Sequence, residues 1–321
     1  MRAKTGLQHS PESERNLAID RFRGTLVVLM VVGDYLSGVN FVPDFLKHAP
    51  DIGFTIADTV APAFIFVIGL NFGPSFERRR NLQGDYDYRY FALRYLSLIG
   101  IGAVIAGAAT MVGQPTNWGV LQAIGVAGLL TILVIRLPSW ARFGIGAAML
   151  IGYQVLLDSA LLDAVLPAVH GGFFGAISWG ALLVLSTAVS DAWRKGFTPY
   201  LSCLLVIGTL AIASSYIFPV SKHRVSLSFD LITLALSALV FLVFEGFSRV
   251  VANRAGLFSW WGESALALYL IHLVLLGIFV SPPTPWWYTD APMWLSAIQL
   301  VAILIVMSLI ARWMHIRRNR N

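Results

Sequence analysis

The chain contains ten stretches of about 20 mainly apolar residues, and only membrane folds accommodate so many. Each stretch can cross about 30 Å of hydrocarbon as an α-helix and is too long and too rich in Leu and Ala for a barrel strand. Only 12% of the 321 residues are charged and 57% are hydrophobic, so most of the surface must face lipid. We therefore predict an all-α polytopic membrane protein, a bundle of about ten transmembrane helices. The predicted spans are 21–40, 54–76, 90–112, 117–136, 142–163, 172–190, 199–218, 227–248, 260–280 and 293–313.

The spans form one continuous membrane domain, because no linker is long enough to separate two. We divide the chain into a polar N-terminal tail at 1–16, a single transmembrane domain at 17–313 and a basic C-terminal tail at 314–321. The first residues lack the small-residue cleavage pattern of a signal peptide, so we expect the first span to remain as an anchor. The single cysteine, Cys203, excludes an intramolecular disulfide and a cysteine-based metal site.

Lys and Arg residues are distributed unevenly and set the predicted orientation. All but three of the 23 lie in the N-terminal segment, in the loops after the second, fourth, sixth and eighth spans, or in the C-terminal tail. Positively charged loops stay in the cytoplasm during insertion. Both termini are therefore predicted to be cytoplasmic, and Lys47, Lys222 and Arg224 are the three cations of the outer face. The net charge of +6 is mostly this orientation signal and indicates no nucleic-acid partner.

A polar loop at 40–54 leads directly into an apolar span and carries the clearest functional signal. His48 lies at the expected membrane edge, ten residues before Asp58, which is near the start of the next helix. Ionisable side chains at membrane depth are costly and usually mark a site. A histidine titrates near neutral pH and can act as a general base, and a nearby carboxylate can orient it. The alternatives are an ordinary loop histidine and a helix-capping aspartate.

The predicted orientation also indicates on which side of the membrane the other polar groups lie. Asp34 lies roughly 16 Å beyond Arg23 along one helix, which places it in the outer half of the membrane. The outer half is also expected to hold Asn117, Gln122 and His272. Groups that transfer protons or form hydrogen bonds therefore gather on the outer side.

Arginines gather at the opposite, inner edge of the membrane. Arg21 and Arg23 open the first span, and Arg78 and Arg79 follow the second. Guanidinium groups suit a polyanionic ligand such as the phosphates of a nucleotide. Positive-inside anchoring explains the same residues equally well, and the sequence has no glycine-rich P-loop.

Two segments carry a recognisable pattern of motifs. Residues 17–35 read LAIDRFRGTLVVLMVVGDY, with Asp-x-x-Arg-Gly in the opening helix. Residues 46–69 read LKHAPDIGFTIADTVAPAFIFVIG, with Lys-His-Ala, Gly-x-Thr-x-Ala-Asp and Pro-x-Phe-x-Phe-x-x-Gly in succession. Looser matches follow in NWGVLQAIGVAG, SLSFDLITLALS and WGESALALYLIH. Taken together, the segments resemble the transmembrane acyltransferase family of heparan-alpha-glucosaminide N-acetyltransferase and its bacterial relatives.

The resemblance implies an enzyme that takes an acetyl group from cytosolic acetyl-CoA and delivers it to an amino sugar or glycan on the outer, periplasmic side. It implies that His48 is the catalytic base, assisted by Asp58. It also aligns Asp34 with a family asparagine, a departure that bears on the acceptor or the mechanism. An aspartate could act as a base or pair with His48, whereas an asparagine can only form hydrogen bonds, so Asp34 is a third candidate catalytic residue. A second departure is Ala123, where an arginine commonly stands.

This resemblance leads to an expected mechanism. The CoA phosphates lie among the inner arginines while the pantetheine arm extends toward His48, which acts as a general base in direct transfer. An acetyl-histidine intermediate is the rival mechanism. No metal is expected. The residues expected to bind the donor are Arg21, Arg23, Arg78 and Arg79. Those expected to bind substrate or stabilise the oxyanion are Asn117, Gln122 and His272.

Two other functions stay open at the level of sequence. The chain could be an O-acyltransferase acting on a sugar hydroxyl, which labelled acetyl-CoA and a choice of acceptors would reveal. It could also be a proton-coupled solute transporter with Asp34, Asp58 and His272 as its proton pathway. The acceptor, the acyl chain length and a homodimer are left open. The few cysteines and the lack of a large soluble segment favour a bacterial inner membrane.

Overall fold

The computed structural model describes residues 16–80, 85–111, 118–250 and 255–320, and in these ranges it consists of helices and loops without a strand. The all-α prediction is therefore confirmed. The helices are α1 (Leu17–Ser37), α2 (Val60–Glu77), α3 (Tyr88–Met111), α4 (Val120–Val134), α5 (Ser139–Leu156), α6 (Leu162–Val165), α7 (Gly172–Lys195), α8 (Phe197–Ser215), α9 (Leu227–Val250), α10 (Leu257–Glu263), α11 (Ala265–Val280) and α12 (Met293–Arg318).

Seven helices of the described part are long and apolar enough to cross a membrane. An eighth span results if α10 and α11, which meet at a bend of 92°, are counted as one broken span. Each of the ten predicted spans contains a helix, but α4 has only 15 residues and α1 carries several charged side chains. The count of ten spans and the cytoplasmic location of both termini therefore stay predictions.

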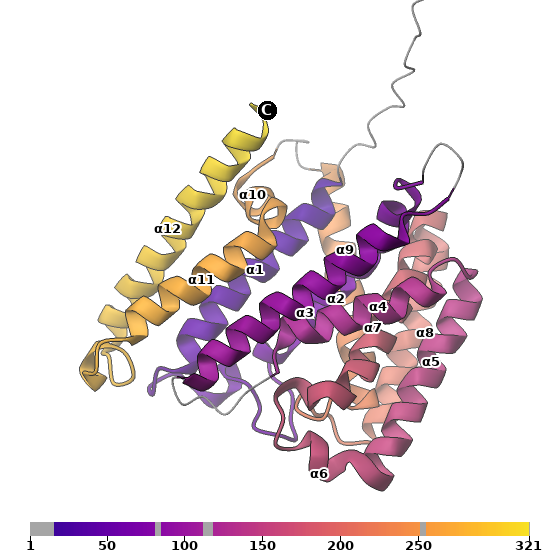
Figure 1. Ribbon diagram of the computed structural model, residues 1–321, viewed down its shortest axis with the longest axis horizontal. Helices are drawn as coiled ribbons and strands as arrows, with labels where there is room; N and C mark the ends of the chain where they lie inside the picture. The colour runs from indigo at the N-terminus through magenta and orange to yellow at the C-terminus, as the bar shows by residue number, and fades with distance from the viewer. Residues whose placement is uncertain (1–15, 81–84, 112–117, 251–254, 321) are drawn as a thin grey trace, which may run out of the picture.

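Helix α7 lies at the centre of the bundle. In the most apolar window of its span, 83% of the residues are buried, compared with 22% for α3 and α8. Helices α2, α4 and α5 pack against α7 (Figure 1). The bundle thus has a protein-enclosed centre, and outer helices such as α3 and α8 present most of their surface outward.

Helices α1 and α10 approach closely at two glycines. A Cβ atom at Gly24 would collide with the backbone of Phe258, and one at Gly262 would collide with the backbone of Asp20. Small residues allow such close approach of helix backbones. The contact holds the beginning of α1, including Arg23, against the break between α10 and α11.

The two ends of the bundle carry different elements. Figure 1 shows the indigo start of α1 and the C-terminal end of α12 toward the same end, near α10, with α6 at the opposite end. Because α1 has 21 residues, its first and last turns lie about 30 Å apart. The loop at 40–54, which carries His48, follows the last turn of α1. His48 is therefore far from the arginines that open this helix.

Candidate active site

His48 and Asp58 form a hydrogen-bonded pair at the end of the bundle where α1 finishes. His48 Nδ1 lies 2.9 Å from Asp58 Oδ1. The His48 side chain is 42% exposed, whereas the Asp58 side chain behind it is fully buried. We assign the hydrogen to Nδ1, because a carboxylate can only accept, and this leaves Nε2 as the basic nitrogen. The arrangement therefore exposes the His48 base and buries the Asp58 carboxylate that orients it.

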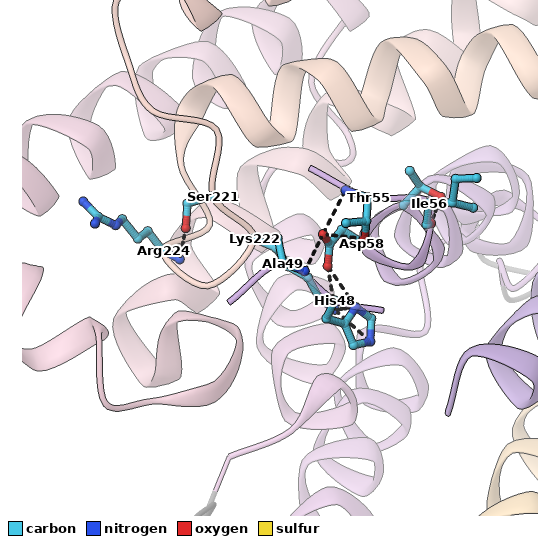
Figure 2. Close-up of polar contacts among 9 residues, drawn as sticks. His48, Ala49, Thr55, Ile56, Asp58, Ser221, Lys222 and Arg224 are labelled. Carbon is cyan, nitrogen blue, oxygen red and sulfur yellow. Dashed lines mark hydrogen bonds and ion pairs between the residues drawn. The ribbon is translucent and has the colours of Figure 1, made fainter. Parts of the chain in front are cut away.

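The loop around Asp58 folds onto this carboxylate. Its Oδ2 accepts hydrogen bonds from Thr55 N at 3.1 Å, from Thr55 Oγ1 at 2.9 Å and from Ala49 N at 3.3 Å (Figure 2). Asp58 itself lies in the 3₁₀ turn Ala57–Thr59, which leads into α2. One carboxylate therefore binds both sides of the loop and fixes His48 relative to the start of α2.

Lys222 is a third ionisable residue at this centre and was not among the predicted site residues. Its Nζ lies 2.9 Å from His48 Nδ1 and 3.6 Å from Asp58 Oδ1. Because Nδ1 donates to Asp58, we assign the ammonium to the carboxylate as its ion-pair partner. Burial lowers the pKa of Lys222, and the Asp58 carboxylate offsets part of that effect. The sequence did carry a signal for Lys222, because cations are rare on the predicted outer face of the membrane.

An ion pair holds the loop that presents Lys222. The Arg224 guanidinium contacts Asp51, with Nε 2.9 Å from Oδ1, and Ser221 Oγ donates to the same Oδ1 at 3.0 Å. Asp51 lies three residues after His48, so the pair connects the two loops of the centre. The guanidinium holds the pKa of Asp51 below its ordinary value. We call Asp51 and Arg224 the loop clamp.

Replacing Asp51 with asparagine should weaken the loop clamp in a pH-dependent way. Arg224 favours the charged carboxylate, so the folded protein binds this proton less tightly than the unfolded chain does. The stabilisation, on the order of 1 kcal/mol for a partly exposed pair, is therefore present at neutral pH. It is lost as the pH falls through the lowered pKa, below the ordinary value of 3.8.

The measurement is the melting temperature in detergent across pH. The difference between the native protein and Asp51→Asn should be largest at neutral pH and should disappear below the ordinary carboxyl range. Asp163→Asn, which removes an exposed carboxylate on α6, is the matched control. A difference for Asp51→Asn that is the same at acid and neutral pH would contradict the clamp.

A cavity of about 670 Å³ opens beside His48 and follows α2 through the bundle. On α2 and the turn before it, the lining runs from Ala57 to Ser75, which is about 27 Å of helix. His48 and Lys222 line one end, and Arg94 lines the other together with Ser75. Apolar side chains from α1, α2, α3 and α4 form most of the wall between the ends.

A second cavity of about 500 Å³ lies at the arginine end. Arg78, Arg79 and Arg94 line it, and it shares Ser75, Phe91 and Arg94 with the first cavity. The two cavities are therefore adjacent. Three guanidinium groups around one recess suit the phosphates of a polyanionic ligand.

The other two arginines predicted to bind the donor have different surroundings. Arg23 lines the large cavity and donates to Asp20 Oδ1 at 3.3 Å. Arg21 donates to Ser248 Oγ at 3.0 Å and lines neither of the two cavities. Arg94, which was not among the residues predicted to bind the donor, lines both cavities. The arginine recess is thus formed mainly by the end of α2 and the start of α3.

Asp34 and His272 are brought together across 238 residues of sequence. His272 Nε2 lies 2.9 Å from Asp34 Oδ2. The Asp34 side chain is 34% exposed and lines the large cavity, whereas the His272 side chain is 1% exposed. The carboxylate predicted for catalysis therefore faces the same cavity as His48, and its imidazole partner is His272.

Of the two amides predicted to stabilise the oxyanion, only Gln122 lies in the described part of the chain. Gln122 Oε1 accepts a hydrogen bond from Gly119 N at 2.7 Å, which caps the start of α4, and Gln122 lines neither cavity. Asn117 lies outside the described residues. Their role in catalysis stays a prediction. Within the described ranges, no group of three or more His, Cys, Asp or Glu side chains is placed to hold a metal ion.

A helical membrane bundle with an oriented imidazole on an internal cavity is typical of a membrane-embedded enzyme. Residues 15–176, half of the chain, match the profile of the family described as heparan-alpha-glucosaminide N-acetyltransferase, catalytic. The chain belongs to this family.

Two relatives carry the same family name. The chain is 33% identical over 136 residues to heparan-alpha-glucosaminide N-acetyltransferase of Mus musculus, which covers 37% of the chain and 19% of the relative. It is 34% identical over 122 residues to the Homo sapiens protein of that name, which covers 34% of the chain and 17% of the relative. The chain thus matches less than a fifth of the length of these relatives.

Proposed function

We propose that the chain is a membrane acetyltransferase that moves an acetyl group from cytosolic acetyl-CoA to an amino sugar or glycan on the outer side of a bacterial inner membrane. The observation that carries the proposal is the cavity that connects the arginine recess to His48. A phosphate-rich head and a long, thin arm ending in a thioester match this charged end and apolar passage. Membership of the family supports the same reaction.

The donor lies along α2 in this proposal. Its phosphates contact Arg78, Arg79 and Arg94, and its pantetheine arm follows the apolar wall toward Ala57. The thioester then meets the acceptor beside His48. The roughly 27 Å between the ends is comparable with the span of a bound, extended nucleotide thioester. No large movement of the chain is required for the acetyl group to reach the opposite end of the bundle.

His48 supplies the base for the transfer. Nε2 removes a proton from the acceptor as its nitrogen attacks the thioester carbonyl, and Asp58 stabilises the imidazolium that forms. Lys222 lies beside the ring, where its ammonium favours negative charge on the carbonyl oxygen of the tetrahedral intermediate. His48 then returns the proton to the leaving thiolate. The resulting products are an acetylated acceptor and CoA.

The test uses the purified chain in sealed vesicles, with acetyl-labelled CoA thioester on one side and D-glucosamine on the other. We expect labelled N-acetylglucosamine in the compartment that received no thioester. Vesicles without protein control for leakage. If free glucosamine crosses unmodified, driven by a pH gradient, the chain is a transporter and the proposal fails. A product formed on glucose but not on glucosamine would make it an O-acyltransferase.

A further inference from the structure

His170 lines the same cavity as His48 and has no role in the proposed transfer. It lies in the 3₁₀ turn Val169–Gly171, directly before α7. Electrostatic interactions connect its ring with Lys222, His48 and Asp58, so these groups lie near one another. A second imidazole is therefore present at the end of the cavity where the thioester arrives in the proposed function.

The backbone of His170 has a conformation that a residue with a Cβ atom rarely adopts. Its φ of 55° and ψ of 34° lie in the left-handed region, and Gly171 and Gly172 follow with φ of 73° and 59°. The carbonyl oxygen of His170 accepts a hydrogen bond from Trp179 Nε1 at 3.1 Å, and the two rings meet edge to face with centroids 6.2 Å apart. Strained residues of this kind cluster at functional sites, where the surrounding structure holds them in place. The turn therefore fixes one imidazole at the cavity at a cost in free energy.

The two ring nitrogens of His170 have different surroundings. Nδ1 is buried and has no hydrogen-bond partner among the described residues. Buried N–H groups without an acceptor are rarer in proteins than buried acceptors with an unused lone pair. We therefore assign the single hydrogen of a neutral ring to Nε2. Nε2 is not enclosed in this way, and within the described ranges no side chain or backbone group bonds to it, so it offers an N–H donor to a ligand in the cavity.

Acyl transfer requires donors of this kind at the carbonyl oxygen. Negative charge develops there in the tetrahedral intermediate, and preorganised N–H groups, including those of histidine side chains, stabilise it. Gln122, one of the amides predicted for this role, bonds to Gly119 N and lines neither cavity. The position of His170 is set by the turn and by Trp179, so its donor is in place before a ligand arrives.

We propose that His170 is a further catalytic residue, which donates a hydrogen bond from Nε2 to the thioester carbonyl oxygen. The proposal rests on the proposed acetyl transfer and assigns an oxyanion donor to it. The acceptor nitrogen forms the C–N bond, the π electrons of the carbonyl move to its oxygen, and His48 takes the proton from the nitrogen. The carbonyl then re-forms, the C–S bond breaks, and the thiolate takes that proton from His48. His170 keeps its hydrogen throughout.

The carbonyl vibration of bound acetyl-CoA tests this contact without requiring turnover. The full chain in detergent receives acetyl-CoA labelled with carbon-13 at the thioester carbonyl, and no acceptor is present. A hydrogen bond to the carbonyl oxygen weakens the C=O bond, so the infrared band should lie at lower frequency than in free acetyl-CoA. His170→Leu should move the band toward the free position, and His170→Gln should keep the native position. Lys222 accounts for the part of the shift that remains.

The same variants separate the N–H donor from the shape of the side chain in turnover. Leucine and glutamine both have a Cβ atom and share the strain of the left-handed turn, but only the glutamine amide can donate. We expect His170→Leu to lower kcat for transfer to glucosamine by about 10²–10³-fold, the loss that follows removal of one oxyanion donor. His170→Gln should keep most of the native kcat, and the KM for acetyl-CoA should be similar in both. His170→Gly suits the turn, so it should fold and be as slow as His170→Leu.

Melting temperatures in detergent check the fold of each variant. The inference is overturned if folded His170→Leu or His170→Gly keeps the native band position or the native kcat. It is also overturned if folded His170→Gln is as slow as His170→Leu, because His170 would then act as a proton acceptor and not as a donor. A band shift that depends on His170, in a native protein that forms no acetylated product, would refute the proposed function and leave the donor site standing.

Discussion

Replacing His48 with alanine should reduce the rate of acetyl transfer by about 10²–10⁴-fold, the range expected when a positioned general base is lost. The chain should still fold and insert, because the His48 side chain is 42% exposed and lies in a loop. The affinity for acetyl-CoA should be unchanged, since its phosphates lie at the far end of the cavity. Steady-state transfer to glucosamine and acetyl-CoA binding, measured on the same preparation, check both statements.

Chemical rescue gives the sharper form of this experiment. Added imidazole can enter the space that His48→Ala leaves at the cavity, and it should restore part of the rate if the missing group is a base. Lys222→Met, which keeps the base but removes the neighbouring charge, should not respond to imidazole. Near-normal turnover of His48→Ala would end the assignment. An acetyl group found on His48 by mass spectrometry, with no acceptor present, would instead select the acetyl-histidine mechanism.

Removing two charges from the arginine recess should raise the KM for acetyl-CoA by at least about 100-fold, because each charge-assisted hydrogen bond contributes roughly 1.5–3 kcal/mol and every 1.4 kcal/mol is tenfold. The double variant Arg78→Gln with Arg94→Gln tests this, since both side chains line the smaller cavity. A short acetyl thioester that ends in N-acetylcysteamine has no phosphates. Its KM should be almost the same for the native protein and for the double variant.

The matched control is Arg312→Gln on α12, an arginine that lines neither cavity. It removes a charge from a helix end without touching the recess, so its KM for acetyl-CoA should stay native. A general loss for both donors in the double variant would indicate damage to the fold. An unchanged KM for acetyl-CoA would mean that the donor head binds elsewhere, and the arrangement along α2 would be wrong.

The positions of the helices could be predicted because the length and apolarity of a span are local properties of the chain. The break after α10 could not be predicted from the sequence. Residues 260–280 read as one apolar span, yet the structure bends by 92° between Glu263 and Ala265. The beginning of this region packs on α1 through Gly262, a contact with a helix more than 200 residues earlier in the chain. No local pattern reports such a contact.

The candidate site also has contacts that the sequence could predict and contacts that it could not. His48 and Asp58 are ten residues apart. A loop of that length that ends at the start of a helix can bring its two ends together, so this pairing could be predicted from the sequence. Lys222 joins them across 174 residues. Gln122 was predicted to stabilise the oxyanion because it is polar. In the structure its side-chain oxygen accepts a hydrogen bond from Gly119 N at the start of α4, a capping role that suits an amide equally well.

By itself the sequence determined a helical membrane protein, the distribution of its cations and the loop in which an imidazole meets a carboxylate, because these depend on composition and on neighbours along the chain. Only the tertiary structure decided that Lys222 stands beside His48, that His272 holds Asp34 and that one cavity joins both to Arg94. The reason is physical. Apolar helices can pack against one another in many arrangements, and the side chains that meet in a cavity are defined only when one arrangement is formed.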